Sequence, residues 1–176
     1  MRDEASTFFR VAGWSAYVSA VVSAFGIVFL LLLYVGFFGG KESLLIFGPL
    51  NDICNIVQYT LALPIAVAFH RLLRDRSPGL SLVAMLIAVV GIVGVVVSQF
   101  LLITDVMSIS EQLAYASASL LIVGVWIVIT GFLGRRSGRL QISVAVIILG
   151  ALYIGYPLWA YRVGQQLLSG KRTTIE

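Results

Sequence analysis

Residues 11–40 read VAGWSAYVSAVVSAFGIVFLLLLYVGFFGG, a stretch of 30 residues without a charged side chain. As an α-helix, about 20 such residues cross the hydrocarbon core of a bilayer, which is about 30 Å thick. A backbone in lipid must satisfy its own hydrogen bonds, and a helix does so within one segment. The stretch therefore predicts a membrane-spanning helix. Four further charge-free windows follow it: Ile53–His70, Ser77–Thr104, Gln112–Gly134 and Leu140–Tyr161.

The composition of the whole chain agrees with a membrane environment. Of its 176 residues 60% are hydrophobic and 11% charged, and the mean hydropathy is +1.02, whereas a soluble domain carries about 25% charged residues. The sequence predicts an all-α polytopic membrane protein, a five-transmembrane-helix bundle forming a single membrane-embedded domain over residues 1–176. The first window is too long for the apolar core of a cleaved signal peptide, so we expect it to remain as the first span. The spans are expected at about 11–38, 50–73, 78–104, 110–134 and 140–162.

The net charge of +4 and the pI of 9.5 do not indicate a nucleic-acid-binding protein. The basic residues lie at the ends of the predicted helices, where anionic lipid headgroups attract them, so the expected partner is the lipid bilayer. Cys54 is the only cysteine, which excludes an internal disulfide and a cysteine-based metal cluster. No metal or other cofactor is expected.

The distribution of basic residues predicts the orientation. With five spans, the side of the N-terminus carries eight arginines: Arg2, Arg10, Arg71, Arg74, Arg76, Arg135, Arg136 and Arg139. The other side carries Lys41, Arg162, Lys171 and Arg172. The positive-inside rule then predicts a cytoplasmic N-terminus and an external C-terminus in a bacterial plasma membrane, although the basic C-terminal tail counts against it.

Local signals predict where the helices begin and bend. Ser77 and Pro78 are typical of an N-cap followed by proline in the first turn, and Ser108 with Glu111 forms a capping-box pattern. Pro64 and Pro157 fall inside predicted spans, where they are expected to produce kinks. Aromatic residues near the span ends are expected to anchor at the membrane interface: Trp14, Tyr17, Tyr34, Phe37, Phe38, Tyr156, Trp159 and Tyr161.

Small residues predict how the helices pack, since close approach of backbones stabilises helix pairs in lipid. The first span carries alanines at four-residue spacing, with Ser15, Ser19 and Ser23 beside them, and the third and fourth spans carry spaced glycines. The partner of these faces is either another helix of the chain or another subunit, including a second copy. The predicted packing residues are Ala12, Ala16, Ala20, Ala24, Gly91, Gly94, Gly124 and Gly131.

One polar constellation stands out, at the start of the second predicted span. At 100° per residue, Asn51, Asn55 and Gln58 share one helix face, bordered by Asp52 and Tyr59. Polar groups are costly in lipid unless they are partnered, so this face is expected to point into the bundle or at a water-filled cavity, on the outer side of the membrane. Other spans are expected to contribute Gln99, Asp105, Tyr153, Tyr156, Gln165 and Gln166.

Three interpretations of this patch compete: a hydrogen-bond network that holds the helices in register, a shallow site for a small polar ligand, cation or lipid headgroup, and an interface with a partner subunit. Catalysis is not expected, because no histidine, cysteine or second carboxylate lies at helical spacing from Asp52. We therefore expect a non-enzymatic accessory, assembly or interaction subunit. The alternative is a binding or transport protein for a small ligand, cation or lipid.

The segments Phe47–Ile53, Leu63–Ala66 and His70–Leu73 resemble small multi-pass bacterial inner-membrane proteins whose activity is not established. The final segments, Gly155–Ala160 and Gly164–Leu168, are similar to the last span of such proteins. The resemblance implies a bacterial protein, of an actinobacterial or similar lineage. It implies no catalytic residue.

Overall fold

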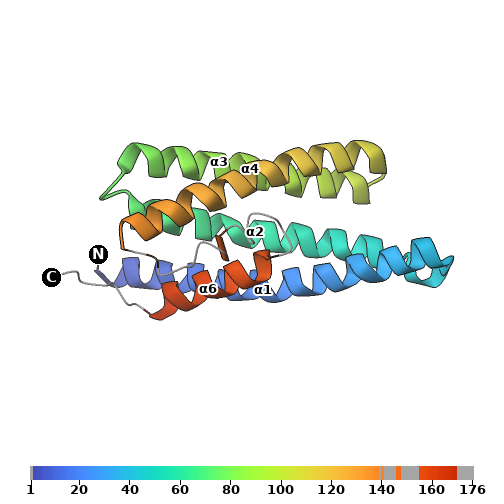
Figure 1. Cartoon of the computed structure of the whole chain (residues 1–176), viewed down its shortest axis with the longest axis horizontal. Helices are drawn as coiled ribbons and strands as arrows, with labels where there is room; N and C mark the ends of the chain where they lie inside the picture. The colour runs from blue at the N-terminus through green and yellow to red at the C-terminus, as the bar shows by residue number, and fades with distance from the viewer. Residues whose placement is uncertain (1, 139, 141–145, 148–154, 170–176) are drawn as a thin grey trace.

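The computed structural model describes residues 2–138, 140, 146–147 and 155–169. No strand occurs among these residues. Figure 1 shows long helices lying side by side along one axis. In chain order the elements are α1 (Arg2–Gly39), the 3₁₀ helix η1 (Glu42–Leu44), α2 (Phe47–Leu73), α3 (Pro78–Ile103), α4 (Ile109–Arg136) and α6 (Tyr156–Ser169).

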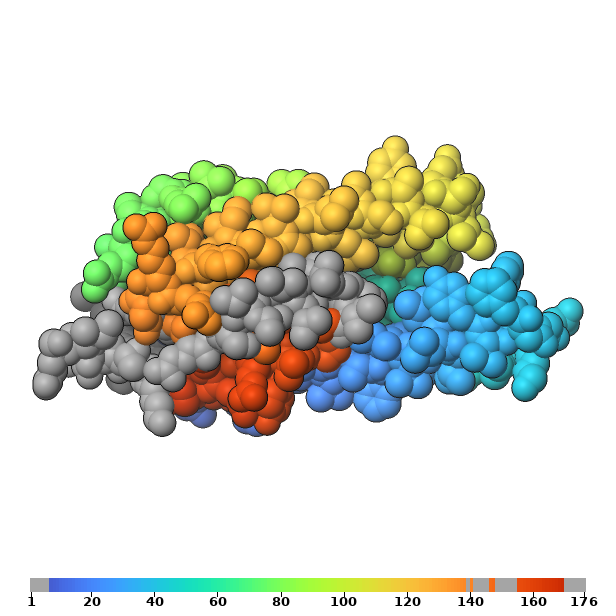
Figure 2. Space-filling view, viewed as in Figure 1, coloured from blue at the N-terminus to red at the C-terminus, as the bar shows by residue number. Residues whose placement is uncertain are grey.

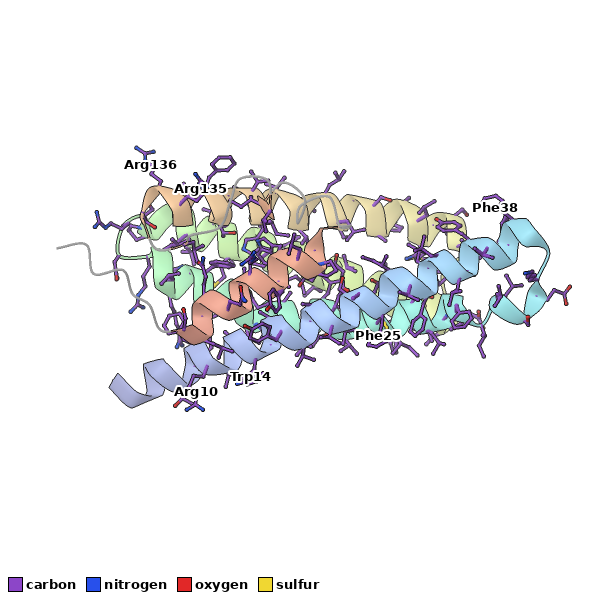
Figure 3. The ribbon with its side chains drawn as sticks, turned by 60° about the horizontal axis from the view of Figure 1, so that its bottom comes forward. Arg10, Trp14, Phe25, Phe38, Arg135 and Arg136 are labelled. Carbon is purple, nitrogen blue, oxygen red and sulfur yellow. The ribbon has the colours of Figure 1, made fainter. Side chains whose placement is uncertain are left out.

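The first four α-helices run antiparallel in succession, joined by short turns (Figure 1). Helix α2 packs against both α1 and α3, whereas α4 packs mainly against α3. The start of α1, the α2–α3 turn and the end of α4 therefore lie at one end of the bundle. We call it the basic end, because it carries exposed arginines. Figure 3 shows Arg10, Arg135 and Arg136 at this end and Phe38 at the opposite end.

Four segments are long and apolar enough to cross a membrane: Thr7–Gly39, Glu42–Leu73, Pro78–Ile103 and Ile109–Arg136. The prediction of a helical membrane protein is confirmed to this extent. The prediction of a fifth span is not confirmed. Most of residues 140–155 lie outside the described residues, and α6 has only 14 residues. At 1.5 Å per residue α6 is about 21 Å long, shorter than the hydrocarbon core.

Helix α6 runs antiparallel to the first half of α1. The Tyr161 ring lies 5.3 Å from the Tyr17 ring. A Cβ at Gly13 would lie 2.7 Å from Leu168 Cγ. The last helical residue, Ser169, therefore lies toward the basic end, where α1 begins. Five spans would have placed it at the opposite end. Because α4 also ends at the basic end, the chain between α4 and Ser169 returns to the end from which it departs.

The helix boundaries follow the local signals of the sequence. Ser77 is the N-cap of α3 with Pro78 at its start, and Ser108 begins α4 with a complete capping box to Glu111. Pro64 lies inside α2. Pro157, however, is the second residue of α6. Its missing N–H costs nothing in the first turn of a helix, so it marks the start of a helix and not a kink within one.

Small residues line the helix contacts. Ala12, Ala16 and Ala20 are buried on α1, whereas Ala24 is exposed and does not contribute to the packing within the chain. A four-residue step advances 400°, so the alanine line drifts by about 40° per step around the helix, and Ser23 and Gly26 take its place. On the α3–α4 contact, Gly91 faces Ile122 and Val123, and Gly94 faces Ser119. Gly124 and Gly131 are both buried on α4, where Gly131 faces Ile147.

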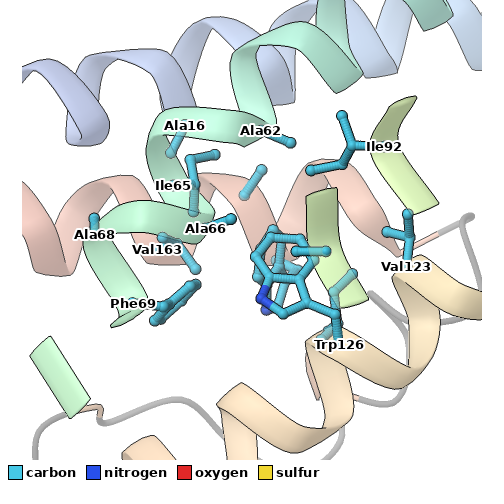
Figure 4. Packing of buried hydrophobic residues seen from close by; sticks show 14 of the residues in the cluster. Ala16, Ala62, Ile65, Ala66, Ala68, Phe69, Ile92, Val123, Trp126 and Val163 are labelled. Carbon is cyan, nitrogen blue, oxygen red and sulfur yellow. The ribbon is translucent and has the colours of Figure 1, made fainter. Parts of the chain in front are cut away.

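The aromatic residues divide into two groups. Trp14 and Tyr34 are exposed on α1; they lie 20 residues apart, or about 30 Å, which matches the hydrocarbon thickness. Tyr156 and Trp159 were predicted as interface anchors but are buried. Trp159 packs on Phe69 and on Trp126, a fully buried residue in the middle of α4. Figure 4 shows Phe69 and Trp126 among the alanines of α2.

Candidate functional site

The polar residues predicted on α2 are buried in the bundle. Asn51, Asn55 and Gln58 are 7%, 6% and 0% exposed, and Tyr59 is buried beside them. Their common face arises from helical periodicity, because positions 51, 55 and 58 recur every three to four residues. Asp52 borders this face and is half-buried.

Helix α1 contributes two buried serines opposite this face. The Ser19 hydroxyl donates a hydrogen bond to the backbone carbonyl of Gln58 at 3.1 Å. A Cβ at Gly26 would lie 3.3 Å from Cys54 Cβ and 3.6 Å from Asn51 Oδ1. Ser23 lies between Ser19 and Gly26 on α1, so it faces α2 between Gln58 and Asn51.

Helix α3 contributes Gln99, which is 5% exposed. His70 Nδ1 and Ser81 Oγ lie 3.2 Å apart and set the register between α2 and α3. Gln99 lies 18 residues after Ser81, and Asp52 lies 18 residues before His70, so the two are at the same level in the antiparallel pair. We call Ser23, Asn51, Asn55, Gln58 and Gln99 the amide cluster.

Several polar atoms of the amide cluster have no hydrogen-bond partner among the described residues. Neither Oε1 nor Nε2 of Gln58 is bonded, and the same holds for Ser23 Oγ, Asn51 Oδ1 and Gln99 Oε1. Gln58 is the twelfth of the 27 residues of α2 and is therefore near the middle of a membrane-capable segment. An unsatisfied buried polar group costs about 1–3 kcal/mol. If the cluster were only a structural network, these unpaired atoms would therefore lower the stability of the folded protein.

The aromatic residues of α6 close the cluster on the side of the basic end. The Tyr156 hydroxyl lies 3.0 Å from Ser19 Oγ, and its ring centroid lies 5.7 Å from that of Tyr59. Since the Ser19 proton is directed at the Gln58 carbonyl, Tyr156 is the donor to Ser19. Trp159 stacks next to Tyr156 at 5.5 Å and continues into the Phe69–Trp126 contact.

Not every predicted residue joins the cluster. Asp105 has a positive φ of 56° and is exposed in the turn between α3 and α4. Gln165 and Gln166 lie near the far end of α6, at the level of Gly13, and Gln165 donates to Tyr161. Tyr153 lies outside the described residues. Of the described residues that were predicted to join the polar patch from the last segment, Tyr156 is the one that lies next to the amide cluster.

From the sequence, Ser19 and Ser23 are predicted to be packing residues of the first span, with no connection to the polar patch. Their spacing of four residues places them on one helix face, and this was the feature of the sequence from which a shared polar surface could have been predicted. Their position opposite Gln58 depends on the α1–α2 register, which the spacing alone does not provide.

The chemistry available at the cluster is recognition by hydrogen bonding. The atoms without partners are four oxygens and one amide nitrogen, so the cluster offers more acceptors than donors. No group of three histidine, cysteine or acidic side chains suited to a metal occurs among the described residues. The cluster contains no acidic or basic residue, and the carboxylate of Asp52 borders it. Such a set can hold a small hydrogen-bond donor in place.

No known protein family matches the chain, and no curated protein or solved structure is similar enough to it to count as a relative.

Proposed function

We propose that this protein is a multi-pass membrane protein that binds a small hydrogen-bonding solute at the amide cluster. The observation that carries the proposal is Gln58, which is fully buried near the middle of α2 and has both amide atoms unpaired among the described residues. Polar side chains within membrane spans are rare, because they are costly there, and they mark binding sites and substrate pathways. A bound donor would satisfy the atoms that the protein leaves unpaired.

The proposed solute is a small cation with several N–H donors, of the ammonium or primary amine class. The carbonyl oxygens of Asn51, Gln58 and Gln99 and the hydroxyl of Ser23 accept hydrogen bonds. Neutral oxygens of this kind replace the hydration shell of monovalent cations in membrane channels. Asp52, half-buried next to the cluster, adds the only nearby negative charge among the described residues of α2.

We further propose that the protein lies in the bacterial plasma membrane with its basic end in the cytoplasm. Among the described side chains, Arg10, Arg71, Arg74, Arg76, Arg135, Arg136 and Arg162 lie on the side of the basic end, with Asp75. The opposite end carries Lys41 with Glu42, Asp105 and Glu111. The positive-inside rule assigns the arginine-rich end to the cytoplasm.

The test is the substitution Gln58→Leu, measured by thermal unfolding of the purified protein in detergent. Removing an unpaired buried amide is expected to raise the free energy of unfolding by about 1–3 kcal/mol. In the wild type, methylammonium chloride is expected to raise the melting temperature more than tetramethylammonium chloride at equal ionic strength, because only methylammonium has N–H donors. Gln58→Leu is expected to abolish this difference.

Gln165→Leu is the matched control, because Gln165 lies on the surface of α6 and, within the described part of the chain, bonds to its helix neighbours Tyr161 and Arg162. It is expected to retain the response to methylammonium. If Gln58→Leu instead destabilises the protein, and the two salts act alike on the wild type, the amide cluster is internal structure and the proposal is wrong.

A second candidate function is that of an accessory or interaction subunit, favoured by a different surface. Ser110, Ala114 and Ala118 lie at four-residue spacing on an exposed face of α4, next to the exposed Tyr115 and Leu121. Small residues at this spacing let a second helix approach closely in lipid. Native mass spectrometry of the protein extracted under mild conditions tests this candidate: a chain that stays single and without partners would contradict it.

A further inference from the structure

A surface groove runs along α1 toward the basic end. It is an open hollow, mostly apolar, lined by Thr7, Arg10, Val11, Trp14, Ser15 and Val18 of α1 and by Leu61 of α2. Figure 3 shows Arg10 and Trp14 pointing outward from this part of α1. The groove therefore faces the lipid and not the interior.

Charge is placed at only one end of this groove. Arg10 lies at the end nearest the start of α1, and Val18 lies eight residues further on, or about 12 Å deeper. Arg10 is exposed and forms no ion pair with a carboxylate among the described side chains. Its neighbour Arg71 differs, since its guanidinium lies 4.1 Å above the centre of the Phe8 ring.

The depth of the groove matches the membrane boundary. Trp14 is 59% exposed, and exposed tryptophans are enriched at the level of the lipid headgroups. Arg10 lies about one helical turn before Trp14 and Val18 about one turn after it. With Trp14 at the headgroup level, Arg10 is expected at the level of the phosphates and Val18 at the level of the acyl chains. A charged head with an apolar tail fits this order of residues.

We propose that this groove binds one anionic phospholipid, with its phosphate at Arg10 and an acyl chain along Val11, Trp14, Val18 and Leu61. A guanidinium donates paired hydrogen bonds to phosphate oxygens, and basic residues between membrane helices form sites for anionic headgroups. The surrounding arginines of the basic end raise the local concentration of anionic lipid. Ser15, a buried residue, also lines the groove.

The experiment is a lipid titration of the delipidated full-length protein in detergent, followed by its melting temperature. The probes are phosphatidylglycerol and phosphatidylcholine with identical acyl chains. Phosphatidylglycerol is expected to raise the melting temperature at lower concentration than phosphatidylcholine. Arg10→Gln is expected to weaken the phosphatidylglycerol response about fivefold, as estimated for one arginine near a lipid headgroup.

Arg136→Gln is the matched control, an exposed arginine at the same end of the bundle that does not line the groove. It is expected to keep the wild-type response. Val18→Trp, which fills the acyl part of the groove, is expected to weaken the response to both lipids. Equal responses to both lipids in the wild type would overturn the proposal, because the groove would then not distinguish an anionic headgroup. Equal losses in Arg10→Gln and Arg136→Gln would also overturn it, since the diffuse surface potential of the basic end would then explain the preference.

Discussion

The α3–α4 contact provides the most direct test of how this bundle is held together. A methyl group added at Gly91 would lie 2.9 Å from Val123 Cγ2, 3.0 Å from Ile122 Cγ2 and 3.0 Å from the backbone nitrogen of Val123. Carbon atoms in favourable contact are about 3.5–4.0 Å apart. Because one of the three atoms belongs to the α4 backbone, a change of side-chain rotamer cannot relieve the crowding. The two helices must separate locally by a few tenths of an ångström.

The expected change in the free energy of unfolding for Gly91→Ala is the sum of two opposing contributions. Overpacking a close contact costs about 1–3 kcal/mol, whereas alanine stabilises a helix by about 1 kcal/mol relative to glycine. Gly91→Ala is therefore expected to lower the free energy of unfolding by about 0–2 kcal/mol. Gly79→Ala is the control, since no atom lies within 4 Å of a Cβ at that position of α3. It gains helix propensity without crowding, so the difference between the two variants isolates the overpacking cost.

The assay is equilibrium unfolding by sodium dodecyl sulfate in mixed micelles, followed by circular dichroism. Gly79→Ala is expected to unfold at the same or a higher detergent fraction than the wild type, and Gly91→Ala at a lower one. The expected difference between the two is about 1–3 kcal/mol. Equal stability of the two variants would refute the close α3–α4 approach at Gly91.

Two further predictions concern the aromatic core and the return of the chain. Trp126→Ala is expected to lower the free energy of unfolding by about 3–5 kcal/mol in the same assay, because Trp126 is fully buried against Phe69 and Trp159. The control Leu121→Ala, at a position that is 73% exposed, is expected to change it by no more than about 0.5 kcal/mol. Similar losses in the two variants would contradict the burial of Trp126. In a Cys54→Ser background, a membrane-impermeant maleimide is expected to label cysteines at positions 77 and 169 from one side of the membrane and at 106 from the other. Labelling of 77 and 169 from opposite sides would contradict the return of α6.

The sequence alone was sufficient to predict four spans and the burial of the polar face on α2. A long segment without charged residues indicates a helix that lipid can surround, and capping residues such as Ser77 and Ser108 mark where such a helix begins. The face of Asn51, Asn55 and Gln58 follows from helical geometry and the cost of polar groups in lipid. Each of these features is a property of a single helix and does not depend on how the helices are arranged.

The last segment could not be predicted in the same way. Residues 140–161 have the length and composition of a span, but composition does not report the direction in which the chain runs. Gly155 and Pro157 were the available signal, because a glycine followed by a proline in the first turn is typical of a new helix start. We interpreted Pro157 as a kink because the window around it was long enough to cross the membrane.

The return of α6 also removes a conflict in the charge distribution. With five spans, Arg162 and the basic residues after it fell on the side opposite the other arginines and counted against the predicted orientation. In the structure the ring of Tyr161, next to Arg162, contacts Tyr17, and Gly164 lies against Gly13. Arg162 therefore lies toward the basic end. Every described arginine therefore lies on the side of the basic end, and this distribution favours the proposed orientation more strongly than a fifth crossing, which places Arg162 on the opposite side.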